Sequence, residues 1–211
     1  MKNIKEALEW RYATKKFDAD KKIDDATFGN LLEALRLSPS SYGLQPWKFI
    51  VVNSKELREK ISVVGYGQPQ ITEASHLIIF ANKKNIDDNL VDEYLQFVSK
   101  EKNIDILNLE GLGKMMKGSF AGKTNEELRS WAAHQAYLAL GVFLTSCAMS
   151  GIDACPMEGF DSIKLDEVLG LSALNLESKA MIAVGYRRES DSHALDKKIR
   201  FPKEEVFIEI N

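Results

Sequence analysis

Apolar and polar positions follow two different periods along this chain, and these periods predict both helices and buried strands. Apolar residues recur every three or four positions over Ile4–Arg11 and Asp24–Leu37, as they do in amphipathic helices. Nearly continuous apolar runs at Lys48–Val52, His76–Asn82 and Ala180–Tyr186 predict strands that are covered on both faces. Because helices and covered strands alternate, the pattern indicates an α/β or α+β fold whose helices shield a sheet.

A long uncharged stretch, Trp131–Ile152, predicts a helix at the centre of the fold. It contains no Asp, Glu, Lys or Arg, and its length would also suffice to span a bilayer. Its polar residues, including His134 and Gln135, would be costly in hydrocarbon, so burial in a globular or dimeric core is the better interpretation. Thr124 and Glu127 have the spacing of a capping box and predict where this helix begins.

Two further segments differ in character from this core. We predict a single domain that spans residues 1–211. Within it, residues 87–123 are charged, helical in pattern and rich in glycine towards their end, which predicts a mobile helical flap. Val206–Ile210 alternates apolar and acidic residues, which predicts a terminal strand or an exchanged arm.

Composition narrows the classes of function. The chain has 211 residues, of which 45% are hydrophobic and 28% charged, values typical of a globular domain. Its net charge of -3 provides no general attraction to nucleic acid or to anionic membranes, so we predict neither as a partner. Cys147 and Cys155 are too few for a disulfide framework and lack further ligands at metal spacing. The chain opens on a helical pattern rather than a signal peptide, which predicts a reducing, cytoplasmic location.

Several familiar catalytic signatures are imperfect or absent. Gly118–Thr124 ends in Gly-Lys-Thr, but three residues separate its glycines where a phosphate loop needs four. No Gly-x-Gly-x-x-Gly follows the first predicted strand, so a Rossmann site is unsupported. His76, His134 and His193 are scattered and accompany no hydrolase signature, so structural histidines are the better interpretation. We therefore assign no catalytic side chain and no metal ligand.

Four clusters of polar residues could bind a ligand or take part in chemistry: Arg11–Phe17, Ser38–Trp47, Pro156–Gly159 and Lys197–Arg200. The basic residues near both ends of the chain could converge on a phosphate, which Arg binds bidentately and Lys binds as a point charge. Two solvated basic patches are the alternative, and charge alone favours that alternative.

In their order along nearly the whole chain, these clusters resemble the FMN-dependent nitroreductase family. No single motif is decisive, but their common order and spacing are specific. The motifs are Arg11-x-x-x-Lys15, Pro39-Ser40-Ser41 with Gln45-Pro46-Trp47, Ala74-Ser75-His76, Pro156-Met157-Glu158-Gly159-Phe160-Asp161 and Lys198-x-Arg200.

The resemblance implies an α+β fold, a three-layer α/β/α sandwich with a mostly antiparallel central sheet, in a homodimer with an exchanged C-terminal arm. It further implies an oxidoreductase that uses FMN and takes hydride from NADH or NADPH to reduce nitroaromatics, quinones or flavins. Alternatives are a relative dedicated to one substrate such as a pteridine or an enone, a flavin-storage protein with little turnover, and a phosphate-binding module without flavin.

The resemblance also implies roles for individual residues. Arg11, Lys198 and Arg200 would hold the FMN phosphate, and Lys15 would lie near flavin N1, where a fixed cation favours the reduced anion. Backbone N–H groups at residues 158–159 would face N5 and O4, and the side chain of Glu158 would orient the nicotinamide. The partner subunit would contribute Pro39, Ser40, Ser41 and Gln135, although Gln135 is almost as readily explained by helix packing.

Two departures from the family pattern affect these roles. Ala13 replaces a serine that adds a hydroxyl in many relatives, and Gln68 and Gln70 replace an Asn and a Lys at the pyrimidine edge. The residues expected at the cofactor are Arg11, Tyr12, Ala13, Lys15, Pro39, Ser40, Ser41, Gln68, Gln70, Gln135, Pro156, Met157, Glu158, Gly159, Lys198 and Arg200. The residues expected at the substrate face are Ser41, Tyr42, Tyr66, Gly67, Met116, Phe120 and Glu158, of which Tyr42, Tyr66, Met116 and Phe120 are as easily packing residues.

Overall fold

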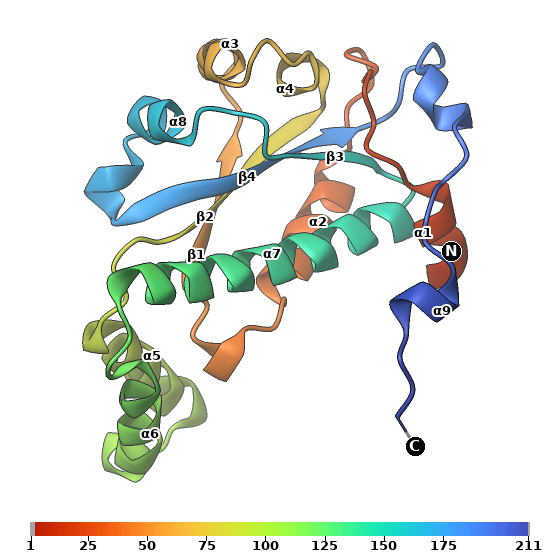
Figure 1. Ribbon diagram of the computed structural model, residues 1–211. Coiled ribbons are helices and arrows are strands. Elements are labelled where there is room, and N and C mark those ends of the chain that lie inside the picture. Colours follow the sequence, from red (N-terminus) through yellow and green to blue (C-terminus); the bar gives the residue numbers. More distant parts are fainter. Residues whose placement is uncertain (1–2, 211) are drawn as a thin grey trace.

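The structure is a computed structural model that describes residues 3–210. Its sheet consists of β1 (Trp47–Val52), β2 (His76–Lys83), β3 (Asp153–Met157) and β4 (Leu176–Gly185), in the spatial order β1-β2-β4-β3 (Figure 1). Every neighbouring pair is antiparallel. The antiparallel sheet predicted for the fold class is therefore confirmed.

Helices cover both faces of this sheet, as Figure 1 shows. The helices on one face are α2 (Asp25–Arg36) and α7 (Asn125–Met149), with α1 (Ile4–Trp10) against α7. The helices on the other face are α3 (Lys55–Val64), α4 (Gln70–Glu73) and α8 (Ser162–Leu169). Alternate residues of β2 belong to separate cores: Ile78 and Phe80 pack with α2 and α7, whereas Leu77 and Ile79 pack with α3 and α4. This is the predicted three-layer sandwich.

α7 is the central helix of one layer. Thr124 caps it through Glu127 in the predicted capping box. Of the helices in residues 3–210, it is the one whose length and composition would permit it to span a membrane. One side of it, with Phe143 and Cys147 fully buried, lies against the sheet and α2. We therefore interpret α7 as a core helix whose outer side remains uncovered in the single chain.

The charged excursion forms a small helical unit with its own core (Figure 1). Its elements are α5 (Asp88–Lys102), η2 (Ile106–Leu109) and α6 (Glu110–Phe120). Asn103, in the left-handed region at φ 51°, ends α5 where the sequence pattern predicts continuous helix. Met116 is 2% exposed and Phe120 packs edge-on against Trp131. These two residues therefore form part of the core, which differs from the expectation that they line an open face.

Some elements were missed because their sequence signals are weak. β3 contains Pro156, which argues against a strand, yet β3 lies at the edge of the sheet, where proline is tolerated. Within the single chain, Val206–Ile210 does not form the predicted strand, because α9 (Lys203–Val206) is followed by exposed, irregular backbone. The short helical turns η1 (Ser41–Gly43), η3 (Leu171–Leu174) and η4 (Ser192–Leu195) complete the described elements.

Candidate functional site

A cavity of about 430 Å³ lies between the two ends of the chain. It brings together the predicted cations Arg11, Lys15, Lys198 and Arg200, which are up to 189 positions apart in sequence. Tyr12 and Ala13 line the same cavity, which also takes in Glu9, Trp10, His193, Ala194, Asp196 and Lys197. The fold thus brings the first and last basic clusters into one cavity. The alternative, that they form two separate solvated patches, does not hold.

The cations in this cavity destabilise one another. Burial, together with the positive charge of Arg200, lowers the pKa of Arg11. Burial and the charges of Arg11 and Arg200 likewise lower the pKa of Lys198, against the opposing charge of Glu9. Among residues 3–210, no carboxylate forms an ion pair with any of the three, and the buried Nε of Arg11 has no hydrogen-bond partner. An anion between them would remove the repulsion and accept the free donor.

Lys198 has a second role that fixes its position. Its ammonium donates to the carbonyl oxygen of Leu8 at 2.6 Å and to that of Arg11. Both carbonyls lie at the C-terminal end of α1, where unpaired carbonyls favour a cation. The C-terminal segment is therefore held to α1 by the same residue that contributes charge to the cavity.

Asp191 organises the cavity wall and was missed by the sequence reasoning. It is 2% exposed and accepts hydrogen bonds from the Tyr12 hydroxyl at 2.9 Å and from the backbone N–H groups of Lys15 at 2.8 Å and Lys16 at 3.1 Å. Burial opposes the ionised form, but these donors outweigh it and hold the pKa of Asp191 below its ordinary value. The signal in the sequence was its place directly before η4, which it caps. It accepts a hydrogen bond there from the backbone N–H of His193 at 3.3 Å.

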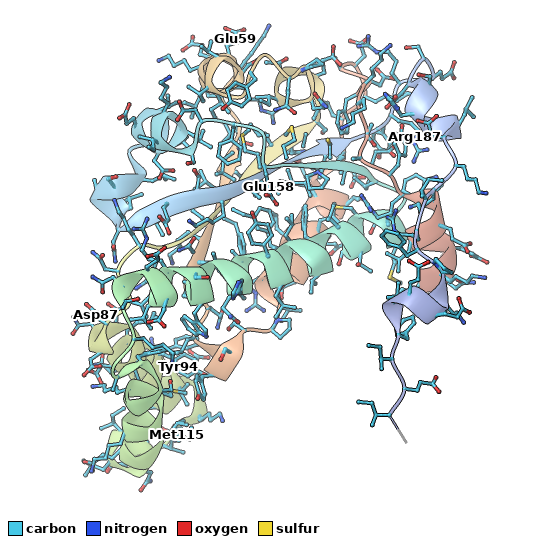
Figure 2. The ribbon with its side chains drawn as sticks, in the orientation of Figure 1. Glu59, Asp87, Tyr94, Met115, Glu158 and Arg187 are labelled. Atoms are coloured by element: carbon cyan, nitrogen blue, oxygen red, sulfur yellow. The ribbon has the colours of Figure 1, made fainter. Side chains whose placement is uncertain are left out.

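A stacked arginine supports the same wall and was also missed. The Arg187 guanidinium lies 4.4 Å from the Trp10 ring centroid and 4.6 Å from that of Tyr12. Its Nε donates to Asp153 at 2.8 Å, and the Thr14 hydroxyl donates to the same carboxylate at 3.4 Å. Figure 2 shows Arg187 beside the N-terminal helix and the C-terminal segment. The start of β3 and the Arg11–Lys15 segment are thereby fixed relative to each other.

A second group of predicted residues lies around the end of β3. The Gln68 Nε2 donates to the carbonyl oxygens of Gly65 at 3.0 Å and Gly159 at 2.7 Å, so its loop abuts the turn after β3. Tyr66 and Gly67 adopt left-handed backbone, with φ of 57° and 69°. Glycine adopts this conformation freely, whereas a tyrosine seldom does, and such outliers are concentrated at functional sites, so Tyr66 supports a site at this loop.

Glu158 lies at the same turn, between the sheet and α7 (Figure 2). Burial, followed by the charge and hydrogen bonding of Glu158, raises the pKa of Tyr137 to about 12. The Tyr137 hydroxyl donates its one proton to the Lys179 carbonyl oxygen at 3.2 Å. Tyr137 therefore stays protonated and links α7 to β4, beside the turn that carries Glu158.

Gln70 occupies the interior beside these groups. It is 5% exposed, and its Nε2 lies 3.9 Å from the Cys155 Sγ. Its Oε1 is buried and has no hydrogen-bond partner within the described chain. Burial raises the pKa of Cys155, opposed by the charges of Lys15 and Arg11, so this thiol lies within the field of the cavity's cations.

The third predicted group lies apart from the cation cavity. The Ser41 N–H donates to the Gln135 Oε1 at 2.8 Å, and the Gln45 N–H donates to the Ser40 Oγ at 3.0 Å. Arg11 interacts electrostatically with Cys147 of α7, twelve positions beyond Gln135. At 1.5 Å per residue, Gln135 and Cys147 are about 18 Å apart along this helix. The Ser41–Gln135 pair and the cation cavity therefore lie near different ends of α7.

Comparison with known proteins places this arrangement in a family. A family model described as the nitroreductase family matches residues 8–186. A Staphylococcus epidermidis protein named "Putative NAD(P)H nitroreductase" is 39% identical over 211 aligned positions, covering 96% of this chain and 94% of that protein. The chain therefore belongs to the nitroreductase family.

Solved structures agree with this at the level of the fold. A crystal structure of a Bacillus subtilis protein described as a "putative nitroreductase" has a TM-score of 0.86 at 20% identity, and the match covers 97% of both chains. A second, from Exiguobacterium sibiricum and solved in complex with FMN, has a TM-score of 0.83 at 18% identity and covers 100% of this chain and 98% of that one.

Proposed function

We propose that this protein is a homodimeric, FMN-dependent oxidoreductase that takes reducing equivalents from NADH or NADPH and passes them to a small acceptor. Nitroaromatics, quinones and flavins are the acceptor classes that we infer. The single observation that carries the proposal is the cavity that gathers Arg11, Lys198 and Arg200, none of which forms an ion pair with a carboxylate of the described chain.

The residues fit FMN in charge and in hydrogen bonding. The cations suit a phosphate, the free Nε of Arg11 supplies a donor, and the buried Oε1 of Gln70 supplies an acceptor for the ring. Lys15 would provide positive charge at the pyrimidine end, and the 158–159 turn would border the reactive edge. The remaining predicted contacts lie nearby. Tyr12 and Ala13 line the cavity, Pro156 and Met157 belong to β3, and Gln68 adjoins the end of β3.

Bound FMN would supply the hydride chemistry, so the chain's own residues need only bind, orient and exclude water. Glu158 would orient the nicotinamide, held in place by the protonated Tyr137. Tyr42 and Tyr66 are 41% and 70% exposed, and with Gly67 and Ser41 they would border the acceptor.

A second copy of the chain would complete each site. Gln135, with Ser41 bonded to it, lies about twelve positions along α7 from Cys147, on which Arg11 acts, so Pro39, Ser40, Ser41 and Gln135 would serve the cofactor of the second copy. The outer side of α7 is uncharged around Gly141, where an added Cβ would meet nothing within 4 Å, so another helix can approach closely. The exposed tail at Val206–Ile210 would then embrace the second copy. Two buried free thiols suit a cytoplasmic protein.

The visible spectrum of the purified protein tests this function. We expect a yellow protein whose flavin band bleaches under anaerobic NADH or NADPH and returns when menadione or nitrofurazone is added. Bleaching without steady turnover would favour flavin storage, and turnover confined to a pteridine or an enone would favour a dedicated enzyme. A protein that stays colourless after FMN is added would contradict the proposal and leave a phosphate-binding module.

A further inference from the structure

The turn at residues 40–45, which contains η1, has an uncommon backbone shape. Tyr42 and Gln45 both adopt left-handed backbone, with φ of 57° and 46°, and Gly43 between them has φ 74°. Glycine takes this conformation freely, whereas residues with long side chains such as tyrosine and glutamine seldom do. Two such outliers within four positions require contacts from the surrounding structure that hold the turn in place.

Hydrogen bonds close the 40–45 turn. The Gly43 N–H donates to the Ser40 carbonyl oxygen at 2.9 Å, and the Leu44 N–H donates to that of Ser41 at 3.2 Å. The Gln45 N–H donates to the Ser40 Oγ at 3.0 Å. These three amide protons therefore report on whether the turn is closed.

Two neighbours hold the 40–45 turn from outside. The Ser41 N–H donates to the Gln135 Oε1 of α7 at 2.8 Å. Leu44 is 3% exposed and belongs to the core of the unit formed by α5, η2 and α6, the α5–α6 unit. That core also contains Leu128 and Ala132 of α7. The turn is therefore anchored to α7 at its start and to the α5–α6 unit near its end.

Tyr94 of α5 supports the middle of the turn. Its side chain is half-buried against the core of the α5–α6 unit and, in Figure 2, lies where that unit meets the turn. A Cβ added at Gly43 would lie 2.6 Å from the Tyr94 hydroxyl oxygen and 3.3 Å from its Cζ. Glycine is thus required at position 43 twice, by the left-handed backbone and by the close approach of Tyr94. Because Gly43 directly follows Tyr42, the ring of Tyr94 fixes the backbone that carries Tyr42.

We propose that Tyr94 is a positioning residue for the acceptor. By packing on Gly43 it keeps Tyr42 in its left-handed conformation. The Tyr42 ring, 41% exposed, then offers a fixed surface on which a planar acceptor such as a nitroaromatic or a quinone stacks. Tyr94 itself contacts neither the flavin nor the acceptor. This inference rests on the proposed function, in which the turn borders the acceptor, and it gives the α5–α6 unit a role as a support for the site.

Hydrogen exchange tests the contact without cofactor or turnover. Exchange of the backbone amides is measured by mass spectrometry, with fragmentation to single residues, in the purified protein and its variants. Tyr94→Ala should speed exchange at residues 43–45 roughly tenfold or more, because loss of the packed ring frees the turn to open. Tyr94→Phe keeps the ring and should restore most of the protection. Phe97→Ala is the matched control on the same helix, since Phe97 is 56% exposed, and it should leave the turn unchanged.

Steady-state kinetics test the role in acceptor binding. Tyr94→Ala should raise the KM for menadione or nitrofurazone roughly fivefold or more, while kcat at saturating acceptor changes by less than about twofold. The reason is that a loosened turn removes binding shared by the ground state and the transition state. The FMN content should persist, since the bond between Ser41 and Gln135 remains. A purely structural role would reduce the amount of active protein and leave KM unchanged.

Each outcome supports or overturns the proposal. Unchanged exchange at residues 43–45 in Tyr94→Ala overturns it, as does exchange that rises equally throughout the α5–α6 unit. Faster exchange with an unchanged KM overturns the acceptor role. A wild type that binds no flavin contradicts the proposed function, and the exchange result, which needs no cofactor, still decides whether Tyr94 holds the turn.

A second variant keeps the test decisive if Tyr94→Ala does not fold. In Gly43→Ala the added methyl group would meet the Tyr94 hydroxyl, so residues 44–45 should exchange faster than in wild type. Combining it with Tyr94→Phe removes that hydroxyl and should slow the exchange again. Equal exchange in Gly43→Ala and in the double variant overturns the contact.

Discussion

At the scale of single residues, the cavity's cations differ from the other charged groups of the chain in what surrounds them. Many lysines and arginines of the described chain have a carboxylate within 4 Å, as Lys117 has with Asp92. Arg11 and Lys198 form no such ion pair within the described residues, and burial together with neighbouring cations lowers the pKa of both, although the charge of Glu9 opposes the shift of Lys198. Folding has thus placed like charges together, which is favourable only when an anion is bound.

Replacing one of these cations tests this arrangement. Arg200→Ala should raise the dissociation constant of FMN roughly 10- to 100-fold, the value of one charge-assisted hydrogen bond. Lys16→Ala is the control, because the exposed Lys16 contacts Asp191 through its backbone N–H, which the substitution retains. Flavin fluorescence titration measures both constants. Equal retention in the two variants would mean that Lys198-x-Arg200 is only a surface patch.

A buried carboxylate outside the site predicts how stability depends on pH. Burial opposes ionisation of Glu177, but hydrogen bonds from Arg129, Lys179 and Asn82 outweigh it and lower its pKa to about 2. Because the folded pKa lies below the unfolded one, the stabilisation is complete above about pH 5 and is lost as the pH falls towards 2. It amounts to about 2–3 kcal/mol.

Glu177→Gln should therefore lower the free energy of unfolding by about 2–3 kcal/mol at pH 7, and the difference from wild type should shrink towards pH 2. Urea denaturation at several pH values measures it. Glu59→Gln, on the outward side of α3 (Figure 2), should change stability by less than about 0.5 kcal/mol at every pH. A difference that is the same at pH 7 and pH 3 would count against the ionised pair.

At the scale of elements, strong periodicity made the main helices and central strands predictable. α7 was predictable from its capping box and its lack of charge, and β2 from its apolar run. β3 was not, because it has only five residues and includes Pro156. What permits that proline is the edge position of the strand, a property of the sheet that a local pattern does not contain.

The α5–α6 unit shows that a local sequence pattern also fails to predict which side chains are buried. A glycine-spaced charged segment indicates an excursion, but it does not tell which apolar residues face inwards. Met116 is 2% exposed and its neighbour Met115 is 54% exposed. Helical geometry turns adjacent residues by about 100°, so one methionine packs while the next faces solvent.

These adjacent methionines form a matched pair for an experiment. Met116→Ala should lower the free energy of unfolding by about 2–4 kcal/mol, because it opens a cavity beneath α6, and Met115→Ala should change it by less than about 0.5 kcal/mol. Urea denaturation measures both. If Met116 instead lined the acceptor face, its substitution would alter the KM for a nitroaromatic and leave stability unchanged.

At the scale of the whole molecule, the sequence motifs divide into two spatial sets. The resemblance predicted that Ser41 and Gln135 act from a partner subunit, and within one chain they do form a pair remote from the cations. The packing of the two ends of the chain decides which motifs share the cation cavity. Asp191 binds the backbone of Lys15, and Lys198 binds the carbonyl of Leu8. No local sequence pattern predicts either of these two contacts.

The proposed completion of each site by a second copy would make assembly and cofactor retention a single property, and Leu138→Glu tests this. Leu138 is 47% exposed on the uncharged outer side of α7, so a carboxylate there would be desolvated in any interface between two copies. Light scattering after gel filtration should show a monomer, and the same fractions should have lost their flavin absorbance. Ile163→Glu is the control, since Ile163 is 72% exposed on α8, on the opposite face of the sheet (Figure 1). That variant should remain a yellow dimer. A Leu138→Glu monomer that retains FMN as tightly as wild type would show that one chain suffices, and Ser41 and Gln135 would then have to be explained by packing alone.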